Sequence, residues 1–597
     1  MCGIIGYVGD DETLEILMDG LSRLEYRGYD SAGVGVVNSS LSVCKRAGTL
    51  EALESALPDD GIDGAAGIGH TRWSTHGPPS DENAHPHTDP TGTVAVVHNG
   101  IIENDAELRE ELSAAGHTFE SDTDTEVVPH LIDRALEGGD DRETAFRTAI
   151  DRLAGSYAVA AVFADTETVF AARHESPLVL GLGEDGTYLG SDVPAFIEHT
   201  NRVIYLEDGE FAALTPTEVT VTDGSGAVVE KSIETIDWEP EAVGKVGYDH
   251  YMLKEIQEQP IAIRDCLRGR VEELSAAVTL ESLEELSRPS TVQLVACGTS
   301  YHAGLYAERL FQRRGIPAQS FVASEYVADE IPVDEETLVV GISQSGETAD
   351  TMRALREANR AGATTLAVTN VVASSADREC DHTLYIRAGP EISVAATKSF
   401  ASQQATLFML VSALADPSPH DQELVRSLRQ LPDHIQTVLD DSSAPTVAEA
   451  FLDSDAYFFI GRGLNTPVAF EGALKLKEIS YKHAEGYPAG ELKHGPLALV
   501  TESTPVFALV SEHGNAAKTV GNIKEVQARG APVVAVTDTP DELPIQSDFT
   551  LEIPETHPWV APIVANVQLQ YVAYWLANYL GRPIDKPRNL AKSVTVQ

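Results

Sequence analysis

The first residues of the chain carry a possible nucleophile together with its own base. The sequence begins Met1-Cys2-Gly3, so removal of Met1 exposes the thiol of Cys2 and a free α-amine on one residue. A cysteine thiol titrates near pKa 8.5 and an α-amine near roughly 7.7 to 8.0, so the amine can accept the thiol proton at neutral pH. A cysteine at position 2 also occurs by chance, and the chemistry needs further residues that present a carbonyl substrate and stabilise its oxyanion.

Three polar stretches downstream offer such residues. They read GHTRWSTHG at 69–77, HNG at 98–100 and SDTDTE at 121–126. An amino-acid substrate needs a cation for its carboxylate and an anion for its ammonium group, and Arg72 and Asp124 can supply them. The side-chain amide of Asn99 and the backbone N–H of Gly100 can form an oxyanion hole.

Each of these features also has a purely structural interpretation. Asn99-Gly100 is a common hairpin dipeptide. Asp122 or Thr123 can cap a following helix, with Glu126 closing a capping box. Five of the 18 histidines lie within 29 residues, at positions 70, 76, 85, 87 and 98. Because their spacing matches no standard zinc pattern, we favour structural hydrogen bonding over a metal site.

The pattern of residues 1–240 predicts mostly antiparallel sheet with a few helices packed on it. Strands are expected at residues 4–8, 32–37, 67–70, 93–98, 157–163, 168–172, 178–182 and 202–206, and helices at 12–26, 105–115 and 126–137. The stretch GLGEDG at 181–186 matches the dinucleotide pattern G-x-G-x-x-G. A strand pattern follows it where a dinucleotide site needs a helix, so a hairpin turn is the better interpretation.

Several of these motifs together resemble the N-terminal-nucleophile glutamine amidotransferases. They are CGIIG (2–6), LEYRGYDSAG (24–33), RW (72–73), HNG (98–100) and TDTE (123–126). The resemblance implies an αββα glutaminase in which Cys2 attacks the side-chain amide of glutamine, forms a glutamyl thioester and releases ammonia. It also implies that Trp73 gates the passage of ammonia and that glutamine is held by Arg72, Thr75, His76, Asn99, Gly100 and Asp124.

After an interdomain connection at 238–247 and a helix start at 248–256, the chain carries an internal repeat. Its first copy has strands at 292–296, 337–342 and 364–368, and its second copy has strands at 456–460, 505–510 and 532–536, all alternating with helices. This alternation predicts two doubly wound, flavodoxin-like parallel sheets. Ligands are then expected at the carboxyl ends of the strands.

Hydroxyl side chains gather at one of these strand ends. Ser343, Ser345 and Thr348 lie between a buried strand and a helix start, where free backbone N–H groups favour a phosphate, and Gly346 permits close approach. Capping of the helix by Ser345 explains one of the three hydroxyls. No G-x-x-x-x-G-K-[ST] motif occurs, so a nucleoside triphosphate is not indicated.

Lysines cluster in the second copy, although the chain has few of them. Four of its 13 lysines fall between Lys475 and Lys493. Lys475 and Glu478 share a helix face, which also fits a surface ion pair. Glu478 can move a proton between adjacent sugar carbons, and His494 can open a sugar ring. Near the C-terminus, Lys592 can form a Schiff base with a ketose carbonyl, unless this segment is simply a frayed tail.

These segments resemble the paired sugar-isomerase (SIS) domains of the glutamine–fructose-6-phosphate aminotransferase (isomerising) family. The segments at 297–300, 343–348, 394–398, 475–478, 490–496 and 591–592 occur in the order of that family. The resemblance implies that Lys592 forms the imine, that Lys475 and Glu478 handle proton transfers, and that His494 of a partner subunit opens the ring. It implies a sugar-phosphate site made of Thr299, Ser300, Ser343, Gln344, Ser345, Thr348, Val394 and Ala591.

The whole chain is therefore expected to be an α/β multidomain enzyme that converts fructose 6-phosphate to glucosamine 6-phosphate with glutamine as nitrogen donor. The expected segments are a glutaminase (2–240), a linker (241–250), two SIS domains (251–430 and 431–585) and an active-site tail (586–597). No metal or redox cofactor is needed, and a homodimer is expected. Amidotransferases that aminate phosphoribosyl pyrophosphate or aspartate would need a pyrophosphate or ATP loop, which we do not find. An enzyme for another sugar phosphate and a non-catalytic sugar-phosphate sensor stay open as alternatives.

The charge balance points away from nucleic acid and towards a salt-rich cytoplasm. Lys and Arg number 42 against 93 Asp and Glu, which gives a net charge of −51. Five widely spaced cysteines without a C-x-x-C pair fit a reducing compartment, and no secretory signal is recognised. The most apolar run, 559–580, is interrupted by Pro, Asn and Gln and is expected to be a packed helix that does not span a membrane.

Overall fold

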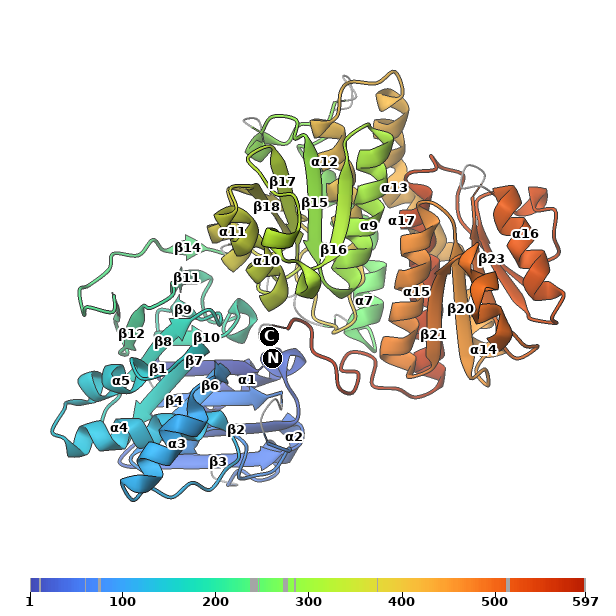
Figure 1. The fold of residues 1–597 in the computed structure, drawn as a ribbon. Helices are drawn as coiled ribbons and strands as arrows, with labels where there is room; N and C mark the ends of the chain where they lie inside the picture. Colours follow the sequence, from blue (N-terminus) through green and yellow to red (C-terminus); the bar gives the residue numbers. More distant parts are fainter. Residues whose placement is uncertain are drawn as a thin grey trace. The chain divides into compact units, whose positions relative to one another are not determined.

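The computed structural model describes residues 2–9, 12–58, 61–73, 77–236, 245, 247–271, 277–283, 286–372, 374–511 and 516–594, apart from the side chains of Tyr26 and Glu542. By their contacts the residues form two compact units, Met1–Val243 with Ala591–Gln597, and Gly244–Leu590 (Figure 1). The expected segment limits stay predictions. Half of the expected linker, 241–244 and 246, lies outside the described residues. The expected limit at 430/431 falls inside helix α13 (Asp421–Asp441).

The first unit contains two antiparallel sheets. The larger has the order β14 (Glu234–Thr235), β11 (Arg202–Tyr205), β9 (Val179–Leu182), β10 (Gly186–Gly190), β1 (Gly3–Gly9), β4 (Ala66–Arg72), β2 (Ser31–Val37) and β3 (Leu41–Ala47). The smaller has the order β13 (Val219–Thr222), β12 (Phe211–Leu214), β8 (Val169–His174), β7 (Gly155–Phe163), β6 (Val94–Ile102) and β5 (His87–Thr88). All eight expected strands are confirmed, and β9 and β10 form the expected hairpin.

Side-chain alternation along the strands explains the layers of this unit. Ile4 and Val8 of β1 belong to a core that includes Ala95 and Val97 of β6, so the two sheets face each other. On its other face β1 meets α1 (Thr13–Leu24), where Ile5 lies against Gly20. Helices α3 (Asp105–Ala114), α4 (Val127–Glu137) and α5 (Arg142–Ile150) share a core with the outer face of the smaller sheet. Helix, sheet, sheet and helix layers follow one another, as expected for an αββα fold.

The second unit contains two parallel sheets with the same strand order. The first sheet runs β16 (Ala318–Val322), β15 (Thr291–Ala296), β17 (Thr337–Ile342), β18 (Thr364–Thr369) and β19 (His382–Tyr385). The second runs β21 (His483–Pro488), β20 (Ala456–Gly461), β22 (Val506–Val510), β23 (Val533–Thr537) and β24 (Phe549–Glu552). Numbered within each half, both sheets have the order 2-1-3-4-5 of flavodoxin-like folds, which confirms the predicted repeat.

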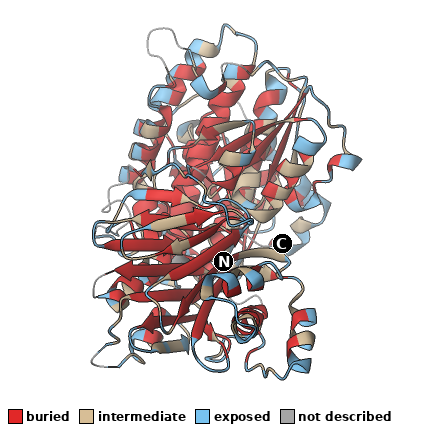
Figure 2. Cartoon of the chain, turned by 90° about the vertical axis from the view of Figure 1, so that its left-hand side faces the viewer, coloured by how far each residue is buried: buried red, intermediate tan, exposed pale blue. Residues whose placement is uncertain are grey.

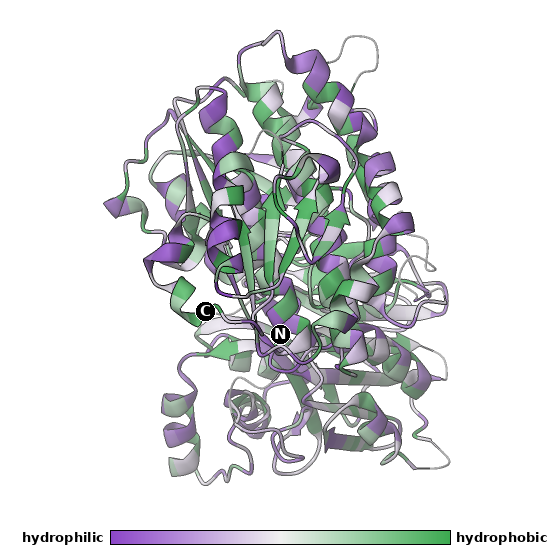
Figure 3. Cartoon of the chain, turned by 90° about the vertical axis from the view of Figure 1, so that its right-hand side faces the viewer, coloured by the Kyte–Doolittle hydropathy of each residue, from purple (hydrophilic) through white to green (hydrophobic). Residues whose placement is uncertain are grey.

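Helices cover both faces of these sheets, as parallel sheets require. One continuous core joins the two halves, and it includes Leu294 of β15 and Phe459 of β20. Its helices include α9 (Gly298–Arg313), α12 (Lys398–Leu414), α15 (Asn465–Ser480) and α17 (Ala561–Tyr579). Figure 2 shows the strands as buried, and Figure 3 shows hydrophobic colouring in the strands and hydrophilic colouring along the outward helix turns. α17 is a packed helix, and no helix among the described residues has both the length and the apolarity to cross a membrane.

Candidate active sites

The thiol of Cys2 is held by the backbone at the end of a neighbouring strand. Cys2 precedes β1, and the pairing of Gly3 with Thr71 places it beside Trp73, the residue that follows β4. The Trp73 N–H donates to Cys2 Sγ over 3.3 Å, and the Cys2 thiol lies 3.5 Å from the Trp73 carbonyl oxygen. The half-buried indole of Trp73 makes an edge contact with Tyr29. The Cys2 thiol is thus held by main-chain atoms, whose positions the sheet determines.

The Asn99 side chain reaches the residue that carries this thiol. Its Nδ2 donates to the carbonyl oxygen of Cys2 over 2.9 Å. Asn99 and Gly100 pair with Ala158 and Tyr157 inside the continuous strand β6, so they do not form the hairpin turn that the dipeptide also suggested. Gly100 has φ +132°, and a Cβ there would lie 2.0 Å from the carbonyl oxygen of Ser156. Only glycine fits this position.

Arg72 and Asp124 provide a buried cation and a buried anion in this unit. Arg72 ends β4 and is 3% exposed. Burial lowers the pKa of its guanidinium, while the charges of Cys2, Asp124 and Asp30 act in the opposite direction. Asp124 opens the short helix η2 (Asp124–Glu126), and its Oδ2 accepts a hydrogen bond from the N–H of Ile102 in β6 over 2.8 Å. Both groups therefore lie around the same end of β6 and β4 as Cys2.

The helix-capping alternative for residues 122–126 does not describe the observed bonds. Thr123 precedes η2 and makes no side-chain capping bond. Glu126 accepts from the backbone N–H groups of Glu120 and Ser121, each over 2.8 Å. Burial raises the pKa of Glu126, but the contact with His130 and the hydrogen bonds from Glu120 and Ser121 outweigh it and bring the pKa to about 2. Glu126 therefore anchors the loop that presents Asp124.

Four histidines of the 70–98 stretch, His70, His85, His87 and His98, are buried. His98 Nδ1 lies 2.8 Å from Thr125 Oγ1, and His87 Nε2 lies 2.8 Å from Thr123 Oγ1. Among the described residues, no group of three or more His, Cys, Asp or Glu is arranged to hold a metal ion. Thr75 and His76, both expected to bind glutamine, lie outside the described residues.

The predicted phosphate loop connects β17 to α10 (Ala349–Arg360) in the second unit. Ser343 Oγ lies 2.8 Å from Thr348 Oγ1 and 3.5 Å from Ser345 Oγ, so the three hydroxyls gather in one place. The N–H of Gly346 donates to Ser343 Oγ over 3.0 Å, and a Cβ on Gly346 would lie 2.2 Å from Ser374 Oγ. Thr348 is the residue that precedes α10, so capping of this helix does not explain Ser345.

Thr299 and Ser300 lie at the same edge of this sheet. They belong to the first turn of α9, directly after β15, and the last residues of β15 and β17, Ala296 and Ile342, are paired. Gln344 accepts a hydrogen bond from the N–H of Asn370, which follows β18, over 3.0 Å. The expected sugar-phosphate residues of this half thus occupy the carboxyl ends of adjacent parallel strands.

A buried charge cluster on α15 joins the two halves of the second unit. Lys475 Nζ lies 2.5 Å from Glu478 Oε2 and 3.4 Å from Glu471 Oε1. Glu471 also accepts from Thr299 Oγ1 over 3.0 Å and contacts His302 Nδ1 at 2.7 Å. Lys475 is 1% exposed, so the alternative of a surface ion pair is wrong.

The neighbouring groups in this cluster favour the charged forms of Lys475 and Glu471. Burial lowers the pKa of Lys475, but the neighbouring Glu478 and Glu471 carboxylates outweigh burial and raise it. Burial raises the pKa of Glu471, but Lys475, His302 and Thr299 outweigh it and lower that pKa. A charged lysine is thus held between two carboxylates, one of which contacts the first turn of α9.

The other expected sugar-site residues have separate positions. Val394 is buried, and its N–H donates to the carbonyl oxygen of Asp585 over 3.1 Å. His494 ends the short helix η7 (Glu491–His494) and is exposed. Ala591 and Lys592 are half-buried and group by their contacts with the first unit.

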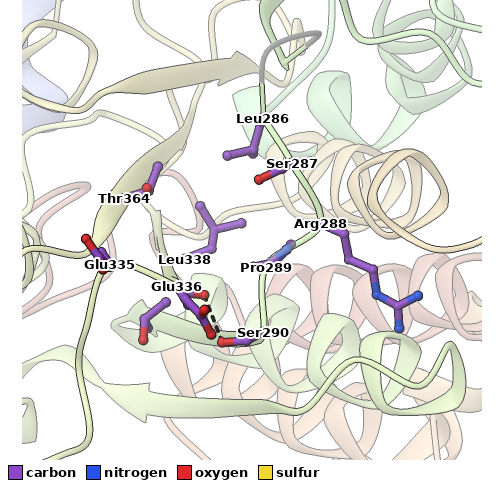
Figure 4. Close-up of a pocket in the computed structure, with 10 residues that line it drawn as sticks. Leu286, Ser287, Arg288, Pro289, Ser290, Glu335, Glu336, Leu338 and Thr364 are labelled. Carbon is purple, nitrogen blue, oxygen red and sulfur yellow. Dashed lines mark hydrogen bonds between the residues drawn. The ribbon is translucent and has the colours of Figure 1, made fainter.

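A pocket of about 360 Å³ occupies the opposite edge of the first parallel sheet (Figure 4). It is lined by Ser290, which precedes β15, and by Thr337 and Thr364, which begin β17 and β18. The Ser290 hydroxyl donates to the carbonyl oxygen of Glu336 over 3.1 Å. Because ligands of such sheets bind at the carboxyl ends of strands, we do not assign substrate to this pocket.

Comparison with known proteins decides the family. A model described as "SIS domain" matches residues 285–413 and again 450–578, and a model described as "Glutamine amidotransferase domain" matches residues 70–198. The glutamine–fructose-6-phosphate aminotransferase (isomerizing) of Halobacterium salinarum is 53% identical over 610 residues, which cover 100% of both chains. This chain belongs to the glutamine–fructose-6-phosphate aminotransferase family. Relatives of the same name from Symbiobacterium thermophilum and Thermococcus kodakarensis are 50% and 48% identical, again over 100% of both chains.

A solved member of the glutamine–fructose-6-phosphate aminotransferase family has the fold of the second unit. The C-terminal domain of glucosamine-fructose-6-phosphate aminotransferase from Francisella tularensis matches with a TM-score of 0.54 and 36% identity. The match covers 57% of this chain and 99% of that one. The predicted glutaminase followed by two SIS domains is therefore confirmed.

Several residues of this aminotransferase contact the sites but were not predicted from the sequence. Arg27 donates through Nε to the Cys2 carbonyl oxygen over 3.1 Å and pairs with Asp192 at 3.2 Å. Glu471 lies four residues before Lys475, so the helical spacing that joined Lys475 to Glu478 also pointed to it. Gln403 donates to Ser300 Oγ over 3.0 Å from α12, a contact that no sequence spacing announces.

Proposed function

We propose that Cys2 carries out the glutaminase half of the family reaction, the glutamine-dependent conversion of fructose 6-phosphate to glucosamine 6-phosphate. With Met1 removed, the α-amine of Cys2 accepts the thiol proton and the sulfur attacks the side-chain carbonyl carbon of glutamine. The carbon–nitrogen bond breaks and ammonia leaves with that proton. Water then hydrolyses the glutamyl thioester to glutamate.

The substrate contacts of this half-reaction follow from charge and hydrogen-bonding capacity. Arg72 pairs with the glutamine carboxylate and Asp124 with its ammonium group. Thr75 and His76 complete the glutamine site by family resemblance. The tetrahedral intermediate carries an oxyanion, which the Asn99 amide and the Gly100 N–H stabilise. Trp73, which holds the Cys2 sulfur through its backbone, gates the passage of ammonia with its side chain.

The second unit carries out the sugar half of the reaction. Thr299, Ser300 and the 343–348 loop hold the phosphate, and Val394 and Ala591 complete the binding site. His494, contributed by a partner subunit in a homodimer, opens the furanose ring. Lys592 forms an imine at C2, and ammonia displaces it. Glu478, paired with Lys475, moves a proton from C1 to C2. The C1 hydroxyl proton passes to the imine nitrogen as C1 becomes the aldehyde, which yields the 2-amino aldose.

One observation carries the sugar half of the proposal. Thr299, which we assign to the phosphate, donates to Glu471, and Glu471 pairs with Lys475, which in turn pairs with Glu478. Binding of the phosphate and proton transfer at C1 and C2 are therefore linked by one buried set of contacts. The five cysteines are free, which fits a cytoplasmic enzyme.

Isotope tracing tests the coupled reaction. We expect glutamine labelled with ¹⁵N at the amide, supplied with fructose 6-phosphate in molar KCl and excess unlabelled ammonium, to yield ¹⁵N-labelled glucosamine 6-phosphate by mass spectrometry. Cys2→Ala should abolish the label, whereas Cys44→Ala, at another half-buried cysteine, should not. Glu478→Gln should form glutamate without amino sugar. Glutamate without amino sugar from the unmodified enzyme would contradict the proposal and favour another acceptor or a sensor.

A further inference from the structure

His70 connects the two sheets of the first unit at the proposed oxyanion hole. It lies in β4, opposite Ile4 of β1, and is fully buried. Its Nε2 lies 3.0 Å from the carbonyl oxygen of His98 and 3.1 Å from Oδ1 of Asn99, both in β6. On its other side the ring stacks on His85, with 4.2 Å between ring centroids.

These contacts determine which nitrogen of His70 carries hydrogen. A carbonyl oxygen only accepts, so Nε2 must donate to His98, and its hydrogen is shared with Asn99. Burial lowers the pKa of His70 to about 3, so the ring is neutral at physiological pH and Nδ1 carries no hydrogen. Nδ1 is buried and has no hydrogen-bond partner among the described residues, which leaves the Nε2–H as the polar function of this side chain.

The same contacts determine how the Asn99 amide is turned. Because His70 Nε2 is a donor, the Asn99 atom that faces it must be the oxygen. The amide nitrogen then faces Cys2 and donates to its carbonyl oxygen over 2.9 Å. Nδ2 carries two hydrogens, so one stays available for an oxyanion formed at Cys2. A flipped amide would instead present its oxygen to that oxyanion and repel it.

We propose that His70 is a positioning residue that locks the Asn99 amide with its nitrogen towards the oxyanion. The inference rests on the role proposed above for Asn99. His70 touches neither the sulfur nor the substrate in this assignment, and its effect on the reaction passes through Asn99. Because the oxyanion forms only during the reaction, loss of His70 should lower the kcat of glutamine hydrolysis and leave the KM for glutamine nearly unchanged.

Matched substitutions at His70 separate this role from packing. Gln places an amide nitrogen near the position of Nε2, whereas Asn ends near that of Nδ1 and Phe only fills the space. We expect His70→Gln to keep kcat within about threefold of the unmodified enzyme, and His70→Asn and His70→Phe to lose about 10- to 100-fold. The control is His85→Phe, since His85 is also a buried ring of the same stack but has no hydrogen bond to Asn99.

Two further measurements distinguish positioning from collapse of the site. Alkylation of Cys2 by iodoacetamide needs no oxyanion hole, so its rate should stay within about twofold in all His70 variants. In an Asn99→Ala background, His70→Phe should change kcat by less than about twofold, because the group through which it acts is gone.

The inference would be overturned if His70→Phe kept kcat, if Gln and Asn lost it equally, or if the effects of His70→Phe and Asn99→Ala multiplied. Loss of alkylation in step with kcat would also overturn it. Failure of the proposed function looks different: Cys2→Ala or Asn99→Ala would then keep glutamine hydrolysis, whatever His70 does.

Discussion

Substitution of Gly100 by Ala should strongly lower the glutaminase activity without affecting the sugar half of the enzyme. Gly100 has φ +132°, and the added Cβ would lie 2.0 Å from the carbonyl oxygen of Ser156, well inside the van der Waals contact distance of about 3.5 Å. The backbone must therefore move by about 1 Å or more. A misplacement of about 1 Å in a site costs roughly 100-fold in rate, and loss of one oxyanion donor costs roughly 100- to 1,000-fold.

We therefore expect kcat for glutamine hydrolysis to fall about 100-fold, which corresponds to about 2.7 kcal/mol of activation free energy. The assay is glutamate release under saturating glutamine, with fructose 6-phosphate affinity by calorimetry as the readout of the second unit. The control is Gly92→Ala, because Gly92 also has a positive φ, +68°, but a Cβ there meets nothing within 4 Å. A Gly100→Ala variant that keeps kcat within threefold, or loses no more than Gly92→Ala, would refute the steric argument.

Four other changes test the remaining structure. Glu471→Gln leaves Lys475 with one carboxylate and should lower the rate of amino-sugar formation at least about tenfold, while the glutaminase rate stays unchanged. Product analysis measures both rates, and equal loss of both activities would contradict the separation of the sites. Gly346→Ala, whose Cβ would lie 2.2 Å from Ser374 Oγ, should raise the KM for fructose 6-phosphate about tenfold, whereas Gly362→Ala, with φ +93° and nothing within 4 Å, should not. The pKa of Glu126 is about 2 in the fold, below its unfolded value, so its stabilisation of roughly 3 kcal/mol is present above the unfolded pKa and disappears as the pH falls towards 2. The difference in unfolding free energy between the unmodified enzyme and Glu126→Gln, measured from the urea unfolding of the first unit, should therefore shrink as the pH falls. A difference independent of pH would refute the assignment. The chain has a net charge of −51, and the screening length falls from about 10 Å at 0.1 M KCl to a few ångström at 2 M, so repulsion between carboxylates weakens. The melting temperature in scanning calorimetry should therefore rise between these salt concentrations. A constant melting temperature would speak against a salt-adapted surface.

Much of the fold was predictable because burial leaves a periodic trace along the chain. The central parallel strands β15, β17, β20 and β22 are continuous apolar runs, and both copies of the repeat were recognised from them. The edge strands β16, β19, β21 and β24 were not predicted, since they are short and partly exposed, and their pairing depends on the neighbouring strand. Strand β3 (Leu41–Ala47) was missed for the same reason, as none of its residues is fully buried.

For the site residues, the sequence suggested candidates, and the tertiary contacts decided between the alternatives. Cys2, Arg72 and Asp124 were predicted because their side-chain chemistry fits a reaction at glutamine, and Ser343, Ser345 and Thr348 because three hydroxyls follow a buried strand. The alternatives attached to them were decided only by contacts. Asn99-Gly100 suits a hairpin as well as an oxyanion hole, and its place in the middle of β6 depends on pairing with β7, which lies more than fifty residues away along the chain.

By itself the sequence determined the family and the order of the domains and suggested candidate reacting groups, because motifs and hydrophobic periodicity are local properties. Tertiary structure alone decided which groups meet and in what electrostatic environment. Lys475 is a buried cation between two carboxylates only because α15 packs into the shared core, and Glu471 reaches Thr299 and His302 only because α9 lies beside it. His70 can orient Asn99 only because β4 and β6, which belong to different sheets, face each other. Such contacts arise from burial across long sequence separations, where the free energy of a charge or a hydrogen bond depends on neighbours that no local pattern records.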